Sequence, residues 1–179
     1  GATATGSRRV WTYTYNQYGQ VLTATDPRGN LAPSDPDYVA ATTTYQYYAA
    51  RDTPHTPPYY QMGDLQSRTD ALGHVTQYTQ YDGNGRLLSL TDPNGVVISM
   101  TYWPRGWLAS RTVGGQTTTY YSYLPTGSLS RITFPDASYV QYGYDAAHRL
   151  TSIADSAGRS VSYTLDGAGN RTGEKYVNP

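Results

Sequence analysis

Apolar and polar residues alternate along many short segments of the chain, and this alternation predicts β-strands. Apolar side chains occupy every second position from Val96 to Tyr102, with Ser99 and Thr101 between them. The pattern recurs at Val140 to Tyr144 and at Val161 to Leu165. Because successive side chains of a strand point to opposite faces, each segment has one apolar and one polar face. No segment shows a helical period, so we expect an all-β fold.

These segments repeat along the chain with a fixed period. Tyr81, Tyr102, Tyr123 and Tyr144 follow one another at intervals of 21 residues, and Leu165 continues the series. Self-similarity of this kind is typical of repeat architectures in which each copy is one supersecondary unit. Each copy here contains two short strands and two turns. We therefore predict tandem β-hairpins of about 21 residues that form a continuous curved antiparallel sheet, part of a β-shell or solenoid.

Three residue types mark each copy of the repeat. In the copy at Tyr81, glycine follows at Gly85 and leucine at Leu87. The glycine suits a turn position with positive φ, while the tyrosine and leucine suit packing between strands. We predict that the following residues are structural repeat positions: Tyr15, Tyr59, Tyr81, Tyr102, Tyr123, Tyr144, Gly19, Gly63, Gly85, Gly106, Gly127, Gly169, Leu87, Leu108, Leu129 and Leu150.

Two details of the repeat make sharper predictions. Leu87 and Leu90 are three residues apart, which places them on opposite faces of a regular strand. Either a β-bulge intervenes or both faces of the sheet are partly covered. Where His148 takes the place of the turn glycine, and in the turn that ends at Ala137, we expect an altered or a strained turn. Leu108→Ala is expected to cost about 2 to 4 kcal/mol if its face is packed.

The repeat also divides the chain. We interpret residues 1–12 as an N-terminal linker or tag remnant together with the first strand, and residues 13–179 as the repeat array. Residues 31–58 are rich in proline and interrupt the pattern, so they are predicted to form an inserted loop that carries a short strand at Thr43 to Tyr48.

The composition of the chain argues against a nucleic-acid partner, a membrane span and disulfides. The 13 basic and 13 acidic residues give no net charge, so a nucleic-acid partner is not expected. There is no long apolar run that would predict a membrane span, and there are no cysteines to form disulfides. The 20 tyrosines, against one phenylalanine, suit a sheet with one wet face. The length of 179 residues permits a sizeable core.

No pattern of residues predicts a catalytic, cofactor or metal site. His55, His74 and His148 lack the spacing of metal ligands. The Asp-rich turns lack the twelve-residue calcium loop, and the glycines at Gly83 lack the strand and helix of a phosphate loop. The carboxylate pairs that could serve hydrolysis, Asp64 with Asp70 and Asp82 with Asp92, all occupy repeat turn positions. We therefore expect no enzymatic activity and no cofactor.

The repeat resembles a known one. Tyr81-Asp82-x-x-Gly85-Arg86-Leu87, followed by Thr91-Asp92-x-x-Gly95, is similar to the tyrosine-aspartate (YD) repeat of Rhs proteins, which also occurs in insecticidal toxin complexes and teneurins. Trp103, Leu124 and Leu165 depart from the motif. The resemblance implies a bacterial protein, secreted or at the cell surface, whose hairpins wall off a C-terminal toxin segment. The expected partners are flanking repeats and that enclosed segment, and nothing after Arg171 resembles the region that closes such shells.

An alternative function is binding of a cell-surface glycan or receptor by a β-repeat module. A stacking platform for sugars needs Trp103 and Trp107 exposed together, whereas a shell wall predicts that at least one of them packs on a neighbouring hairpin. Both interpretations leave unpaired sheet edges on this chain, so we also expect edge-to-edge self-association.

Overall fold

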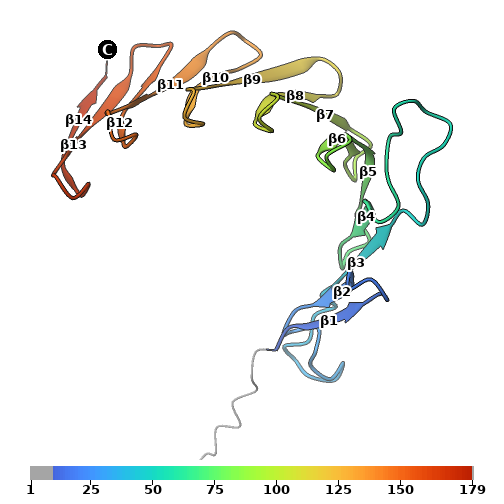
Figure 1. Cartoon of the computed structure of the whole chain (residues 1–179). Coiled ribbons are helices and arrows are strands. Elements are labelled where there is room, and N and C mark those ends of the chain that lie inside the picture. The colour runs from blue at the N-terminus through green and yellow to red at the C-terminus, as the bar shows by residue number, and fades with distance from the viewer. Residues whose placement is uncertain (1–9, 179) are drawn as a thin grey trace, which may run out of the picture. The chain divides into compact units, whose positions relative to one another are not determined.

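A computed structural model describes residues 10–178, which contain fourteen β-strands and no helix (Figure 1). Within the described residues the chain divides into two compact units, with the boundary between Val97 and Ile98. The strands of the first unit are β1 (Thr12–Tyr15), β2 (Val21–Thr25), β3 (Thr42–Tyr47), β4 (Leu65–Thr69), β5 (Val75–Tyr81) and β6 (Leu87–Thr91). The remaining strands are β7 (Val97–Tyr102), β8 (Leu108–Val113), β9 (Thr117–Tyr123), β10 (Leu129–Thr133), β11 (Tyr139–Tyr144), β12 (Leu150–Asp155), β13 (Ser160–Leu165) and β14 (Arg171–Val177).

Each unit is an antiparallel sheet in which strands that are consecutive in sequence are neighbours. In the first unit every strand from β1 to β6 pairs with the next one along the chain. In the second unit the same holds from β7 to β14. The predicted all-β fold of tandem hairpins is therefore confirmed in each unit. None of the described residues belongs to a helix that could cross a membrane.

A β-bulge beside the repeat leucine explains the three-residue spacing. Leu150 pairs with Tyr144, and Ile153 pairs with Tyr142, so β12 fits one more residue between these pairs than β11 does. The extra residue brings Leu150 and Ile153 to one face of the sheet, together with the two tyrosines. Of the two explanations for the spacing of three, the β-bulge is therefore correct. The same interruption of the ladder occurs next to Leu65, Leu108 and Leu129.

The sheets have no enclosed core among the described residues. No large side chain there is fully buried, and Ala24, at 9% exposure, is the one apolar residue classed as buried. Most strand residues are half-buried. A sheet needs a second layer to enclose its apolar face, and within each unit no such layer is present. The sizeable core that the chain length permits is therefore not formed, and the apolar face of the repeat lies partly open.

The strand predicted at Thr43 to Tyr48 in the proline-rich segment is confirmed as β3, and it divides that segment into two loops. β3 lies inside it and pairs with both β2 and β4, so it is an ordinary strand of the sheet. The loop predicted over residues 31–58 is thus split into residues 26–41 and 48–64 on either side of β3. At the N-terminus, residues 1–9 lie outside the described part of the chain, and β1 begins at Thr12, across the boundary predicted there.

Candidate functional site

Two of the repeat tyrosines, Tyr81 and Tyr144, each couple their hairpin to the one before it. The hydroxyl of Tyr81 donates a hydrogen bond of 2.7 Å to the carbonyl oxygen of Leu65. The hydroxyl of Tyr144 makes the equivalent bond of 2.8 Å to the carbonyl of Leu129. In both cases the acceptor is the repeat leucine of the preceding hairpin. The tyrosine therefore adds a side-chain bond to the backbone ladder between neighbouring hairpins.

The structure places the other predicted positions in regular register. Each repeat tyrosine in the series pairs with the leucine or valine that follows its turn: Tyr15 with Val21, Tyr81 with Leu87, Tyr102 with Leu108, Tyr123 with Leu129 and Tyr144 with Leu150. The predicted glycines all have positive φ, namely Gly19, Gly63, Gly85, Gly106, Gly127 and Gly169.

Tyr59 does not occupy the repeat position that the sequence suggested for it. Tyr47 pairs with Leu65, and its hydroxyl donates a bond of 2.9 Å to the carbonyl of Val21, as the repeat tyrosines do. Tyr59 lies in the loop of residues 48–64, with its backbone N–H bonded to Asp52. The inserted residues lengthen this turn, so counting back from Tyr81 leads to a loop residue instead of the strand residue Tyr47.

The aspartate of the motif holds its own turn. Asp145 accepts bonds of 2.9 Å from the backbone N–H groups of Ala147 and Arg149, and its second oxygen accepts one of 2.7 Å from Arg149 Nε. Arg86 closes on Asp82 in the same way. We call the turns held by such an Asp–Arg pair clasped turns: Asp82–Arg86, Asp145–Arg149 and Asp155–Arg159.

The hydrogen bonds and the burial of these groups shift their pKa values. Bonds from the backbone N–H and the guanidinium of Arg149 hold the pKa of Asp145 below its ordinary value. Burial, reinforced by the negative charge of Asp64, raises the pKa of the Tyr81 hydroxyl. Burial likewise raises the pKa of the Tyr123 hydroxyl. These shifts follow from the roles of the three groups in turns and packing.

The two turns without a glycine keep the usual turn and are strained. His148 has a φ of 61° and Ala137 a φ of 65°, in the left-handed region that side chains with a Cβ adopt at a cost. The turn bonds are still made, because the N–H of His148 donates to the carbonyl of Asp145 at 2.9 Å. Of the two expectations, the strained turn is the one observed.

The carboxylate pairs that could have served hydrolysis are engaged in turns. Asp92 accepts bonds of 2.9 Å from the N–H groups of Asn94 and Val96. Asp64 accepts one of 2.7 Å from the N–H of Gln61. Asp70 bonds two backbone N–H groups of its own turn and lies 3.0 Å from the Nδ1 of His74. No group of three or more metal-binding side chains was found in residues 10–178.

One polar cluster was not found from the sequence. Asp52, only 3% exposed, lies 2.9 Å from Nδ1 of His55 and accepts a bond of 2.8 Å from the N–H of Tyr59. The rings of His55 and Tyr59 are stacked, with centroids 3.7 Å apart. The cluster fixes the fold of the loop of residues 48–64. The available signal was an aspartate three residues before a histidine in a proline-rich segment.

Trp103 and Trp107 lie at the two ends of one turn, which has no Asp–Arg pair to hold it. Trp107 packs against Tyr123 of the next hairpin, with ring centroids 5.3 Å apart. Trp103 is 48% exposed. At least one of the two thus packs on a neighbouring hairpin, which is what the shell interpretation predicts. We call the turns Trp103–Trp107 and Leu124–Ser128 bridged turns.

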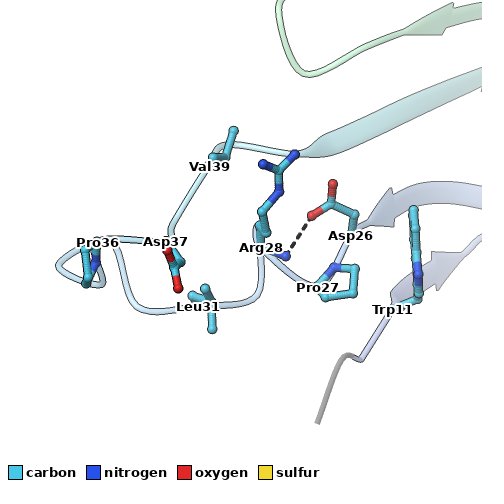
Figure 2. Close-up of a pocket in the computed structure, with 8 residues that line it drawn as sticks. All are labelled: Trp11, Asp26, Pro27, Arg28, Leu31, Pro36, Asp37 and Val39. Carbon is cyan, nitrogen blue, oxygen red and sulfur yellow. Dashed lines mark hydrogen bonds between the residues drawn. The ribbon is translucent and has the colours of Figure 1, made fainter. Parts of the chain in front are cut away.

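A separate pocket of about 640 Å³ lies in the first unit, beside the loop of residues 26–41. Figure 2 shows Trp11 on one side of it and Asp37 on the other, with Asp26 and Arg28 between them. Asp26 accepts bonds from the backbone N–H groups of Arg28 and Gly29 through one oxygen. The pocket therefore combines an exposed indole with acidic and basic side chains.

Comparison with known proteins gives matches in both sequence and fold. The model of the RHS Repeat family matches residues 63–97, 123–160 and 144–178. The Probable deoxyribonuclease RhsA of Dickeya dadantii strain 3937 is 34% identical over 85 residues, which are 47% of this chain and 6% of that protein. The Probable deoxyribonuclease RhsB of the same strain is 32% identical over 109 residues, 49% of this chain and 8% of that protein. The chain thus spans less than a tenth of the length of these relatives.

Solved structures share the fold. The crystal structure of TcdB2-TccC3-Cdc42 matches with a TM-score of 0.60 and 21% identity, over 88% of this chain and 9% of that one. The crystal structure of TcdB2-TccC3-TEV matches with a TM-score of 0.52 and 20% identity, over 86% of this chain and 9% of that one. The Tc holotoxin pore of Photorhabdus luminescens matches with a TM-score of 0.51 and 16% identity, over 90% of this chain and 12% of that one.

Proposed function

The chain belongs to the RHS repeat family, and we propose that its hairpins form part of the wall of a shell that encloses a C-terminal toxic segment of a longer protein. As a member of that family it is a structural repeat module. The enclosing role is the finer proposal. In it, the flanking repeats and the enclosed segment are the partners of this chain, and the protein is secreted or displayed at the surface of a bacterium.

The observation that carries this proposal is the coupling of successive hairpins. Within each unit the backbone ladders join every strand to the next, and the hydroxyls of Tyr81 and Tyr144 add bonds across hairpin boundaries. A sheet extended in this way presents no backbone gap to a polypeptide or a protease. Its mechanism is mechanical, because a continuous barrier keeps the enclosed segment from proteases and from its target.

We further propose that these 179 residues carry no catalytic activity. The named relatives are probable deoxyribonucleases, of which this chain matches 6% and 8%. Asp82, Asp92 and Asp145 use their oxygens within their own turns, which leaves them poorly placed to bind a metal or a phosphodiester. A nuclease assay on the purified chain with Mg²⁺ tests this point, and cleavage that survives repurification would refute it.

Limited proteolysis of the full-length parent tests the enclosing role. The parent would be digested natively and again after mild denaturation that opens the repeats, and the C-terminal segment would be followed by mass spectrometry. We expect protection that disappears on opening. Immediate native cleavage of the C-terminal segment, with the repeats intact, would overturn the proposal.

The pocket in Figure 2 favours glycan binding as the second candidate function. Trp11, 56% exposed, offers a flat apolar surface on which a sugar ring can stack. Asp26, Arg28 and Asp37 line the same pocket and supply acceptors and donors for hydroxyl groups. A fluorescence titration of the chain with soluble oligosaccharides tests this candidate. A shift in emission that Trp11→Ala abolishes would support it, and no shift at millimolar sugar would exclude it.

A further inference from the structure

The bridged turns keep the backbone of the repeat turn while replacing its side chains. The N–H of Trp103 donates to the carbonyl of Trp107 at 2.8 Å, and the N–H of Leu124 donates to the carbonyl of Ser128 at 2.9 Å. The aspartate of the motif is replaced by Trp103 in one turn and by Leu124 in the other. Because the two turns belong to consecutive hairpins, the exchanges bring apolar side chains together at one place on the second unit.

Contacts between these hairpins fix the walls of the resulting groove. Arg105 Nη1 donates a bond of 2.8 Å to the carbonyl of Pro125, and the indole N–H of Trp103 donates one of 3.2 Å to the carbonyl of Tyr121. Trp107 packs between Tyr123 and Gly127. A Cβ added at Gly127 would lie 2.9 Å from the Trp107 indole. The groove is therefore preorganised, which lowers the cost of binding.

The groove has a volume of about 560 Å³, and its lining is mainly apolar. The residues that matter here are Trp103, Pro104, Trp107, Tyr123, Leu124 and Pro125. Trp103 is 48% exposed, so it is available to a ligand. Aromatic side chains that flank prolines are the usual surface on which extended proline-containing peptides dock.

The polar groups of the groove select among ligands. The indole N–H of Trp103 is already bonded to backbone, so it is not free to bind the hydroxyl group of a sugar. Arg105 is the one charged residue that lines the groove, and within residues 10–178 it forms no ion pair with a carboxylate. It keeps further N–H donors, and its positive charge complements a carboxylate.

We propose that this groove binds an extended peptide in which a proline or aromatic residue lies within two or three residues of a carboxylate. The rigid ring occupies the space between Trp103 and Pro125, and the carboxylate pairs with the guanidinium of Arg105. A flexible alkyl chain would lose more conformational entropy on such an open surface. The proposal concerns this chain alone and does not depend on the enclosing role.

Isothermal titration calorimetry of the 179-residue chain with a synthetic peptide tests the proposal. The probe is acetyl-Asp-Pro-Pro-Tyr-Asp-amide, and the control peptide carries asparagine in place of both aspartates. We expect the Trp103→Ala chain to bind the probe about 10-fold more weakly, as for a central aromatic contact. Arg105→Gln should weaken binding about 3-fold and remove the preference for the acidic peptide.

Tyr18→Ala is the matched control, because it removes an aromatic side chain that is 66% exposed and lies outside the groove, and it should leave the affinity unchanged. If Trp103→Ala fails to fold, as judged by circular dichroism, Arg105→Gln alone decides. Absence of binding by the unaltered chain at millimolar peptide would overturn the proposal. Equal binding by the Arg105→Gln chain would also do so, as would displacement of the peptide by maltotriose.

Discussion

The clasped and bridged turns solve the same structural problem in two ways. In the turn Asp145–Arg149, the carboxylate and the guanidinium hold the turn from within. In the turn Trp103–Trp107, the same backbone bond is closed, but Arg105 and the Trp103 indole reach the next hairpin. Both kinds of turn therefore share a residue with positive φ at the fourth turn position. The aspartate of the motif is dispensable, so the side chains can bind the turn itself or its neighbour.

The largest difference between the two kinds of turn should appear at their glycines. Gly85, in a clasped turn, has a φ of 76° and open space around it. Gly127, in a bridged turn, has a φ of 93°, and a Cβ added there would lie 2.9 Å from the Trp107 indole. We expect Gly85→Ala to cost about 1 kcal/mol from backbone strain alone. Gly127→Ala should cost about 2 to 3 kcal/mol, because it also displaces the indole. Equal losses in urea unfolding would show that Trp107 moves freely.

The repeat tyrosine should contribute differently in the two settings. The hydroxyl of Tyr81 bonds the carbonyl of Leu65, whereas the ring of Tyr123 packs on Trp107 and its hydroxyl makes no hydrogen bond in the described part of the chain. Tyr81→Phe is expected to cost about 1 kcal/mol, and Tyr123→Phe almost nothing. Urea unfolding of both variants measures the difference, and a larger loss for Tyr123→Phe would contradict the assignment.

The raised pKa of Tyr81 predicts how the stability of the chain changes at alkaline pH. Burial raises the folded-state pKa of Tyr81 above the unfolded value of 10.0. The contribution of its neutral hydroxyl is therefore complete below about pH 10 and is lost as the pH rises through the folded pKa. Urea unfolding midpoints would be measured from pH 8 upward. Above about pH 10 they should fall in the unaltered chain and fall less in Tyr81→Phe. Parallel curves would exclude this role for Tyr81.

A smaller effect is expected where a clasped turn carries strain. His148 has a φ of 61° in the turn Asp145–Arg149. His148→Gly should stabilise the chain by about 0.5 kcal/mol, since glycine adopts this φ without steric cost but loses more entropy on folding. Ala147→Gly is the matched control, because this neighbour is absent from the residues with positive φ and its replacement should destabilise. Thermal unfolding measures both, and a loss of stability in His148→Gly would mean that the ring makes compensating contacts.

The smallest effect is expected at low pH, in the backbone of the turn Asp145–Arg149. The pKa of Asp145 is lowered in the folded state, so its contribution is present above the ordinary value of 3.8 and is lost as the pH falls through the folded pKa. Amide exchange at Arg149 should therefore increase at the acid end of this range. Exchange at Trp107 should not change in the same way, because no carboxylate closes the turn Trp103–Trp107. Identical acid responses at the two amides would mean that the clasp does not hold its turn.

The sequence was sufficient for the features that depend on local chemistry. Glycine at a fixed turn position predicted positive φ at Gly85, and the spacing of Leu87 and Leu90 offered the bulge as one of two explanations. The strain at His148 followed from the steric cost of a Cβ in the left-handed region. Each of these inferences needs only a few neighbouring residues.

The features that depend on insertions and on packing were not predictable in this way. The turn before Leu65 contains extra residues, so a fixed repeat length counted back from Tyr81 leads to Tyr59. The repeat position is filled by Tyr47. The loss of 2 to 4 kcal/mol expected for Leu108→Ala assumed a packed face, whereas Leu108 is only half-buried here. The groove of the bridged turns depends on which hairpins are adjacent, and a repeat departure such as Trp103 gave the one local sign of it.

Electron cryomicroscopy of the full-length parent would show what lies on each face of these sheets. If the hairpins form a shell, the half-buried repeat leucines face the interior of a closed wall, with density for further polypeptide inside it. An open array with solvent on both faces and no enclosed density would overturn the enclosing role and would favour a surface-binding module.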